Sequence, residues 1–520
     1  MSAASEQPSS LRRGVFWSLL SFVGTKSLTF LATLVLARLL EPSAFGVLAA
    51  VLAFITLLEL ISDLGMKATV IYESERGITS RVQTAFTLNL AFTVVLTALA
   101  VGLAPLVASF FRAEGNEALF AVASLDLLLR GLGNVHDALL LRDMEFKRRI
   151  VPQLTSNVAR GAAMIGLAVA GLGPSALVIG FIIGSGVWTA TLWIIRPFRP
   201  NLTIDRGAVR GVATYGGWAT ALELIAAVGQ RADVALIGNV LGSRALGLYT
   251  IAQRVPELLI GNVAWNLSVV AFPALSQRRD RREGGLEETT LNLVRYACLF
   301  ALPVGTFLAV LAGPLVIVLF GQRWAEAADI MAALAILFVT ACVVLPLGDT
   351  FKALGKQPIM VAVNAVAVPA MIAAMLLASP GGVGAVAWAR TGVGVVQAVV
   401  WLVLISHLLQ LRLIRVVAKL RPGVAAAAGV AVCSVGVRIV LPEPAVLPLL
   451  AGTVAAGLGG LAALRALAQT EYAELRDLVH RQVLSTAIVP ARWRWAPPVG
   501  PAEMEQAVEL ETAPDPPPPR

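Results

Sequence analysis

Residues 211–249 read GVATYGGWATALELIAAVGQRADVALIGNVLGSRALGLY, and the organisation of the whole chain follows from this stretch. It has the composition of a long apolar helix that ends at Gly242, where a glycine and two polar residues indicate a turn. Its last part, Asn239–Tyr249, resembles an earlier piece, Arg38–Leu48, which reads RLLEPSAFGVL. In both pieces a helix ends in leucine, a polar turn follows, and a glycine with aliphatic neighbours opens the next helix. The similarity predicts an internal repeat.

The composition is that of a membrane protein. The 520 residues are 57% hydrophobic and 14% charged, and their mean hydropathy is +0.79. Soluble proteins carry about 25% charged residues, and apolar runs of about 20 residues, the length that crosses a bilayer, recur along the chain. We therefore predict an all-α polytopic membrane protein with about 14 transmembrane helices. The expected spans are 15–39, 44–64, 84–111, 117–140, 150–171, 174–195, 212–240, 245–272, 289–312, 327–351, 358–378, 382–408, 423–441 and 445–466.

Basic residues gather in alternate loops, which predicts the orientation in the membrane. These loops carry several arginines or lysines each, for example at 142–149 and 196–210, whereas the loops between them carry one or none. Loops rich in lysine and arginine stay on the cytoplasmic side, so we expect both termini in the cytoplasm. The net charge of +9 follows from these loops and does not point to nucleic acid as a partner.

The repeat extends along most of the apolar region. LAPLVASFF at 103–111 resembles LAGPLVIVLF at 311–320, and Asp137 follows the fourth span as Asp349 follows the tenth. Halves with an even number of spans have the same orientation, and transporters built from such parallel repeats bind substrate between the halves. We predict two six-helix repeats around a central cavity and two extra C-terminal helices. The expected parts are a cytoplasmic N-terminus (1–12), an N-lobe with spans one to six (13–200), a linker (201–210), a C-lobe with spans seven to twelve (211–412), spans thirteen and fourteen (413–466) and a cytoplasmic tail, amphipathic and then disordered (467–520).

Six short motifs occur in an order that is typical of one family of exporters. They are LVLARLLEPSAFG (34–46), RDMEFKRR (142–149), DVALIGNVLGSRALGLY (233–249), FPALSQ (272–277), LFGQRWAEAA (319–328) and FKALGKQP (351–358). Together they resemble the Wzx-type polysaccharide flippases of the multidrug/oligosaccharidyl-lipid/polysaccharide exporter superfamily, in particular the branch similar to the colanic acid exporter. The resemblance covers about residues 11–415.

This resemblance implies a fold and an activity. It implies a protein of the inner (plasma) membrane that moves an undecaprenyl-pyrophosphate-linked oligosaccharide repeat unit to the periplasmic leaflet for surface polysaccharide biosynthesis. A V-shaped cavity between two six-helix lobes is implied too, with the first and seventh spans facing each other across it. We expect this lipid-linked substrate and membrane lipids as partners. A polysaccharide polymerase and other assembly proteins are candidate partners, and we expect a monomer.

Ionisable residues inside the predicted spans are the candidate binding residues, because a charge in the membrane is costly unless it is paired or faces water. By the repeat, Lys26 and Arg231 lie on one stripe of equivalent helices, about one turn apart in depth, so both are expected to point into the cavity. Arginine binds a pyrophosphate with a bidentate fork and lysine binds it as a point charge. The predicted cationic cavity consists of Lys26, Arg130, Arg160, Arg231, Arg254 and Arg390. The expected sugar contacts are Thr29, Tyr215, Trp218 and Gln230, and the candidates for ion coupling are Asp126 and Asp233.

Some of these charges also have a structural interpretation. Asp126 and Arg130 are four residues apart and share a helix face, so neutralisation within the pair is the favoured interpretation. The same holds for Arg254 and Glu257, which are three residues apart. The cations of spans one and seven have the alternative of pairing with acids on neighbouring helices. Pro256, in the middle of the eighth span, predicts a kink.

Two other functions compete with the flippase. An ion-coupled exporter of small molecules or drugs belongs to the same superfamily, but the excess of basic over acidic residues in the spans argues against a cationic drug. A membrane glycan polymerase or transferase would need a large outer loop with catalytic residues, and the predicted outer loops are short. The sequence has no Walker A motif and no histidine spacing typical of a metal site. We therefore expect no cofactor, no metal, no catalytic residue and no enzymatic activity.

Overall fold

The computed structural model describes residues 24–63, 78–143, 145–197, 217–280, 285–440 and 446–469, together with 472, 473 and 476. The chain up to Ala463 forms one compact unit and the chain from Leu464 forms a second. Every contact reported below lies within the first unit. The predicted N-terminal segment, the predicted inter-lobe linker and nearly all of the predicted tail lie outside the described residues.

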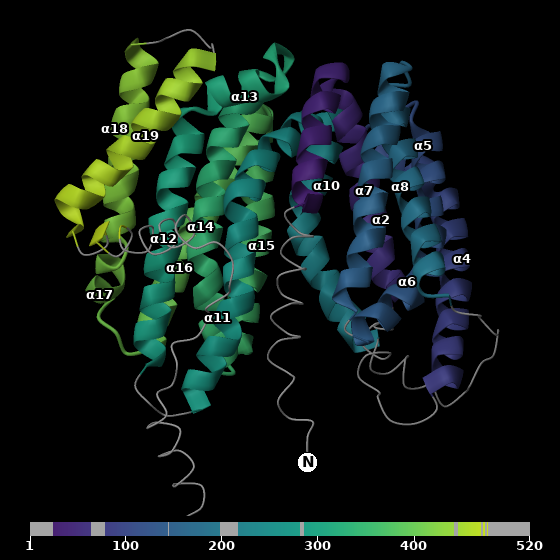
Figure 1. The fold of residues 1–520 in the computed structure, drawn as a ribbon, viewed down its shortest axis with the longest axis horizontal. Coiled ribbons are helices and arrows are strands. Elements are labelled where there is room, and N and C mark those ends of the chain that lie inside the picture. Colours follow the sequence, from purple (N-terminus) through teal and green to yellow (C-terminus); the bar gives the residue numbers. More distant parts are fainter. Residues whose placement is uncertain are drawn as a thin grey trace, which may run out of the picture. The chain divides into compact units, whose positions relative to one another are not determined.

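Helices follow one another along the described residues (Figure 1). What we call the first helix set consists of a helical segment at 24–39, α2 (Pro42–Asp63), α4 (Ile78–Phe110), α5 (Glu117–Ala123), α6 (Leu125–Arg142), α7 (Phe146–Val169) and α8 (Pro174–Ile195). The second helix set consists of α10 (Gly217–Pro256), η2 (Glu257–Gly261), α11 (Asn262–Asp280), α12 (Leu286–Val310), α13 (Ala312–Phe320), η3 (Gln322–Trp324), α14 (Ala327–Ala353), α15 (Gln357–Ala378), η4 (Ser379–Gly381) and α16 (Gly382–Leu408). The short α17 (Leu413–Ala418) and the longer α18 (Arg421–Val440) and α19 (Val446–Leu467) come after them.

The helices are long and apolar enough to cross a membrane. Within the described ranges, ten segments meet this requirement by length and composition. Two of the ten cover more than one predicted span: Gln357–Leu408 contains 358–378 and 382–408, and Arg231–Pro273 contains 245–272 with the end of 212–240. Two predicted spans are not among the ten: the segment 24–39 begins outside the described part, and α7 is more polar than its neighbours. The prediction of an all-α polytopic membrane protein is confirmed, and the number of fourteen spans stays a prediction.

The long helix α10 breaks at Gly242, where the sequence predicts a turn. Gly242 has a φ of 82° and a ψ of −179°, which is not helical. Glycine adopts a positive φ without the steric cost that a Cβ atom would bring. A second irregularity follows Pro256, where a kink is predicted: residues Glu257–Gly261 form the π-helical η2. Proline has no N–H to donate to the preceding turn, and π-turns are a common way to accommodate such a gap.

The fourth predicted span, 117–140, corresponds to the single membrane-span candidate Glu117–Arg142, with an irregularity of one residue at Ser124. Helix α5 ends at Ala123 and α6 begins at Leu125. Between them, the Ser124 hydroxyl donates a hydrogen bond to the Phe120 carbonyl oxygen at 2.9 Å. Serine hydroxyls that bond back to the preceding turn compete with the helical hydrogen bonds and bend helices.

The two helix sets meet where α2 crosses the second part of α10, and this crossing has a reciprocal form. A Cβ atom at Gly46 would collide with the Ser243 carbonyl, and a Cβ atom at Gly247 would collide with the Pro42 carbonyl. Gly46 and Gly247 are equivalent in the two similar pieces of sequence, and so are Pro42 and Ser243. Small residues allow helix backbones to approach closely in membranes. The contact therefore follows the predicted repeat at this place.

Side-chain hydrogen bonds beside the crossing are reciprocal as well. The Arg38 guanidinium donates to the Val318 carbonyl at 2.7 Å, and the Asn239 amide donates to the Phe110 carbonyl at 2.8 Å. Arg38 and Asn239 are again equivalent positions. The indole N–H of the buried Trp324 donates a further hydrogen bond, of 2.8 Å, to the Ala37 carbonyl. One carbonyl group at the end of α4 and one in α13 are thus bonded by side chains of the opposite helix set.

Candidate functional site

A cavity of about 120 Å³ lies between the segment 24–39, α2, α7, α8 and the second part of α10. Its walls are mostly apolar, with leucine, alanine and phenylalanine side chains from the first helix set. The polar residues that line it are Thr29, Thr33, Asn157, Arg160, Thr250 and Arg254. The structure thus brings together three of the predicted site residues, Thr29, Arg160 and Arg254, which come from three different predicted spans.

Among the described residues, Arg160 forms no ion pair with a carboxylate at 4 Å or less, although Asp126 and Glu59 attract its charge from farther away and Arg130 repels it. Its guanidinium carbon lies 4.7 Å from the centre of the Phe181 ring. Its Nε atom is buried and has no hydrogen-bond partner among the described residues. A buried arginine in a membrane protein is costly unless its charge is compensated. The orphaned nitrogen therefore marks Arg160 as a position where an anion would be stabilised.

The charge of Arg254 is only weakly compensated, by Glu257 on the same helix face. A guanidinium nitrogen of Arg254 lies 3.9 Å from a carboxylate oxygen of Glu257, so the predicted pairing on one helix face is confirmed. Both side chains are more than one third exposed. An exposed ion pair at this distance is worth little, so it leaves Arg254 able to bind an anion from the cavity.

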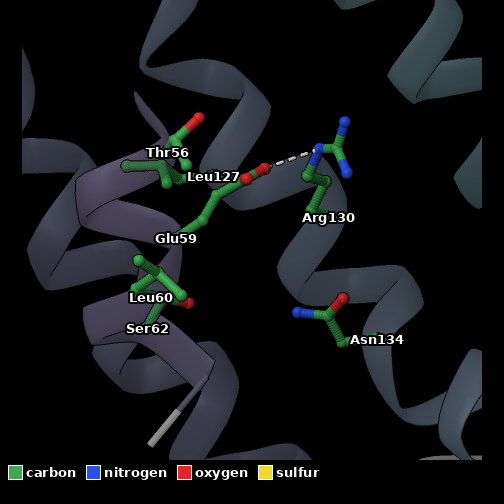
Figure 2. Close-up of a pocket in the computed structure, with 7 residues that line it drawn as sticks. All are labelled: Thr56, Glu59, Leu60, Ser62, Leu127, Arg130 and Asn134. Carbon is green, nitrogen blue, oxygen red and sulfur yellow. Dashed lines mark ion pairs between the residues drawn. The ribbon is translucent and has the colours of Figure 1, made fainter. Parts of the chain in front are cut away.

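Arg130, also predicted to line the cationic cavity, lies instead between two carboxylates of the first helix set. Its Nε atom is 2.7 Å from Glu59 and 2.8 Å from Asp126, which confirms the predicted Asp126 pair. Figure 2 shows the ion pair of Glu59 and Arg130 at the wall of a second cavity of about 170 Å³, with Asn134 one helical turn away. Asp126 is fully buried, and its Oδ1 atom has no hydrogen-bond partner in the described part of the chain.

Arg390 and Asp233, two further predicted site residues, pair with each other inside the second helix set. A guanidinium nitrogen of Arg390 contacts the Asp233 carboxylate and the Tyr249 hydroxyl, and the hydroxyl lies 3.0 Å from the same carboxylate oxygen. Asp233 and Tyr249 are buried. Tyr249 was not predicted as part of any site, although it belongs to the quoted stretch. This network joins the two parts of α10 across the break at Gly242.

The remaining predicted residues stay predictions. Lys26 is half-buried in the segment 24–39 and Arg231 is exposed on α10, and neither is among the described residues that line the cavity with Arg160. Tyr215 lies outside the described residues, as do the side chains of Trp218 and Gln230. Conversely, sequence reasoning missed Asn157 and Thr250. Their spacing was a usable signal, because Asn157 precedes Arg160 by three residues and Thr250 precedes Arg254 by four, so each shares a helix face with the arginine.

Apolar helices long enough to cross a membrane, around a cavity lined by Arg160 and Arg254, define a multi-pass membrane protein with polar residues among its helices. Residues 35–329 match the family described as polysaccharide biosynthesis protein, and the chain belongs to this family. The prediction of a family of polysaccharide transporters, and not of enzymes, is thereby confirmed.

Curated relatives share about a quarter of the residues. The succinoglycan biosynthesis transport protein ExoT of Rhizobium meliloti is 26% identical over 324 residues, which are 62% of this chain and 65% of that protein. The teichuronic acid biosynthesis protein TuaB of Bacillus subtilis is 22% identical over 57% of this chain and 62% of its own length. The lipopolysaccharide biosynthesis protein WzxC of Escherichia coli is 22% identical over 66% of this chain and 70% of its own length. The chain thus spans slightly less than two thirds of the length of the first two relatives.

Solved structures confirm the fold. The lipid II flippase MurJ, in an inward closed conformation, matches with a TM-score of 0.70 and 13% identity, over 87% of this chain and 99% of that chain. A multidrug resistance MATE family transporter in an inward-facing conformation matches with a TM-score of 0.59 and 15% identity, over 76% of this chain and 95% of that chain. The arrangement of helices is therefore that of a MurJ- and MATE-like membrane protein.

Proposed function

We propose that the protein moves a polyprenyl-pyrophosphate-linked oligosaccharide, with undecaprenol as the carrier, across the inner membrane for surface polysaccharide biosynthesis. The observation that carries this proposal is Arg160 at the cavity, a half-buried cation whose buried Nε atom has no hydrogen-bond partner among the described residues. The family membership supports a role in polysaccharide export. The names of ExoT and WzxC, a transport protein and a lipopolysaccharide biosynthesis protein, point the same way.

The chemistry of the cavity fits a phosphorylated sugar carrier. A guanidinium group binds phosphate oxygens with two parallel hydrogen bonds, which Arg160 and Arg254 would supply from opposite helix sets. The hydroxyls of Thr29 and Thr250 and the Asn157 amide donate and accept hydrogen bonds, as sugar hydroxyls require. A cation lined by neutral polar groups favours an anionic headgroup over a cationic drug.

The size of the cavity makes opening of the helix sets part of the proposal. Pockets that hold drug-sized ligands have volumes of about 300 to 1,000 Å³, and the cavity at Arg160 measures about 120 Å³. A pyrophosphate with even one sugar therefore enters only when the helix sets separate. We propose alternating access of two six-helix lobes, 13–200 and 211–412, within a fourteen-span topology with both termini cytoplasmic. Spans 13 and 14 and a cytoplasmic tail would follow the lobes.

Ion coupling, if it drives transport, is assigned to the first helix set. Glu59 and Asp126 both pair with Arg130, and both also attract the charge of Arg160. The Oδ1 atom of the buried Asp126 has no hydrogen-bond partner among the described residues. Asp233, the other predicted acid, already has a cation and a hydroxyl as partners. We propose Asp126 over Asp233 as the residue that exchanges an ion, with consumption of the exported product as the other source of driving force.

Deletion of the gene tests the proposed function. We expect polyprenyl-linked repeat units to accumulate on the inner leaflet and surface polysaccharide to disappear, which mass spectrometry of extracted lipids and surface staining would measure. Unchanged lipid-linked units together with increased sensitivity to cationic dyes would support a small-molecule exporter instead. Unchanged units with shorter polymer would support a glycan polymerase.

A further inference from the structure

We propose that Phe181 and Gly184 of α8 are positioning residues that hold the Arg160 guanidinium at the cavity for an isoprenyl pyrophosphate. This inference rests on the proposed function, because it assigns Arg160 to the anionic headgroup. Neither residue needs to touch the substrate: both act through the arginine, which α7 contributes from the neighbouring helix.

The arginine stem lies on the surface of α8 at Gly184. A Cβ atom at position 184 would fall 2.8 Å from the Arg160 Cβ atom and 2.8 Å from its Nε atom. Carbon atoms of packed side chains do not approach so closely, so only glycine leaves this path for the stem. The same added atom would lie 3.2 Å from the Ser156 carbonyl oxygen, one turn earlier on α7.

The arginine head lies on Phe181, one helical turn before Gly184. The guanidinium carbon is 4.7 Å from the ring centre, a distance typical of a cation–π contact. Phe181 also lines the cavity. The ring therefore faces the cation at the place where the anion would approach, and it adds an attraction that a leucine would not give.

The two contacts together pre-organise the cation. A free arginine side chain has many rotamers, and ordering it on binding costs free energy. Because Gly184 fixes the aliphatic part of Arg160 and Phe181 fixes its guanidinium, the side chain is largely ordered before the ligand binds. The expected consequence is tighter binding of the anion, without any change in the number of contacts to it.

A simpler alternative is close packing of α7 on α8 with no role for the arginine. Gly180 and Gly184 are four residues apart, and a spacing of this kind allows membrane helices to approach. A Cβ atom at Gly180 would meet Met164 of α7. The two interpretations differ in one respect: only the positioning role makes the effect of residue 184 depend on the presence of Arg160.

A double-mutant cycle tests this dependence. The full-length protein in lipid nanodiscs is titrated with farnesyl pyrophosphate, and titration with farnesol gives the apolar part of the binding. We expect Arg160→Ala to raise the Kd about tenfold, since it removes charge-assisted hydrogen bonds. We expect Gly184→Ala to raise it about fivefold in the wild-type background, and not at all in the Arg160→Ala background.

A matched control is available on the same helix. At Gly186 an added Cβ atom would meet only the end of Leu129 at 4.0 Å, so Gly186→Ala should leave the Kd unchanged. If Gly184→Ala does not fold, Phe181→Leu takes its place in the cycle, with the same expected dependence on Arg160.

The failures of the two proposals are distinguishable. An equal rise in Kd from Gly184→Ala with and without Arg160, or no rise in either background, overturns the positioning role and leaves the proposed function intact. An unchanged Kd in Arg160→Ala alone overturns the assignment of this cation to the headgroup, and the positioning role with it.

Discussion

The crossing of α2 with α10 and the charged interiors of the two helix sets differ in how far they follow the repeat. At the crossing, Gly46 and Gly247 meet the opposite backbone in the same way. In the interiors, the first helix set places Arg130 between two acids beside a cavity, whereas the second pairs the buried Asp233 with Arg390 and Tyr249. The comparison teaches that the repeat preserves the backbone contacts of the fold and the pairing of Asp137 and Asp349 with a base, while the groups around Arg130 and Arg390 have diverged.

The difference between the charged groups around Arg130 and Arg390 has a physical interpretation. A buried pair of one acid and one base is neutral. If either partner is replaced, the other charge stays buried without compensation and the protein is destabilised. A base shared by two acids keeps its compensation when one acid is protonated. We therefore propose that Asp233 and Arg390 form a fixed structural pair, and that the group around Arg130 changes its charge during transport.

The largest expected effect comes from breaking the fixed pair. Arg390→Ala leaves the Asp233 carboxylate buried without its cation, and we expect a loss of about 3–5 kcal/mol of unfolding free energy. Thermal unfolding in detergent measures it. The double variant Asp233→Asn with Arg390→Gln should regain most of the stability. If the double variant is stable but does not transport, Asp233 has a role in transport. The assignment of ion coupling to the first helix set is then wrong.

The next effect concerns the crossing. Gly46→Ala places a methyl group against the Ser243 carbonyl, and overpacking of this kind costs about 1–3 kcal/mol. We expect a lower melting temperature and loss of export, with the equivalent Gly247→Ala behaving alike. Gly102→Ala on α4 is the control, because an added Cβ atom there meets nothing within 4 Å. Normal export from Gly46→Ala would show that the crossing is not required in this form.

The smallest effect tests the symmetry of the hydrogen bonds beside the crossing. Arg38→Ala and Asn239→Ala each remove one bond to a carbonyl of the opposite helix set, so each should cost about 0.5–1 kcal/mol. Equal shifts of the melting temperature would extend the symmetry from backbone to side chains. A shift for only one variant would confine the symmetry to the glycines.

Local features could be predicted from the sequence, and contacts between distant segments could not. The break at Gly242 and the pairs within one helix, Asp126 with Arg130 and Arg254 with Glu257, follow from the spacing of a few residues. Sequence reasoning found ionisable residues in the spans because charges there are costly. Whether such a charge meets an acid or a cavity depends on which helices pack together. The second acid at Arg130 and the partner of Arg390 therefore came only from the structure.

The central claim is that Arg160 and Arg254 at the cavity bind the pyrophosphate of a lipid-linked substrate, and one measurement tests it directly. Cells with Arg160→Ala and Arg254→Ala in one chain are converted to spheroplasts, and a membrane-impermeant lectin reports the fraction of lipid-linked repeat units on the outer leaflet. We expect that fraction to fall about tenfold or more, since each lost guanidinium weakens binding of the anion by about that factor. The exposed Arg415→Ala on α17 should leave it unchanged. A normal fraction with the double variant correctly inserted would contradict the account.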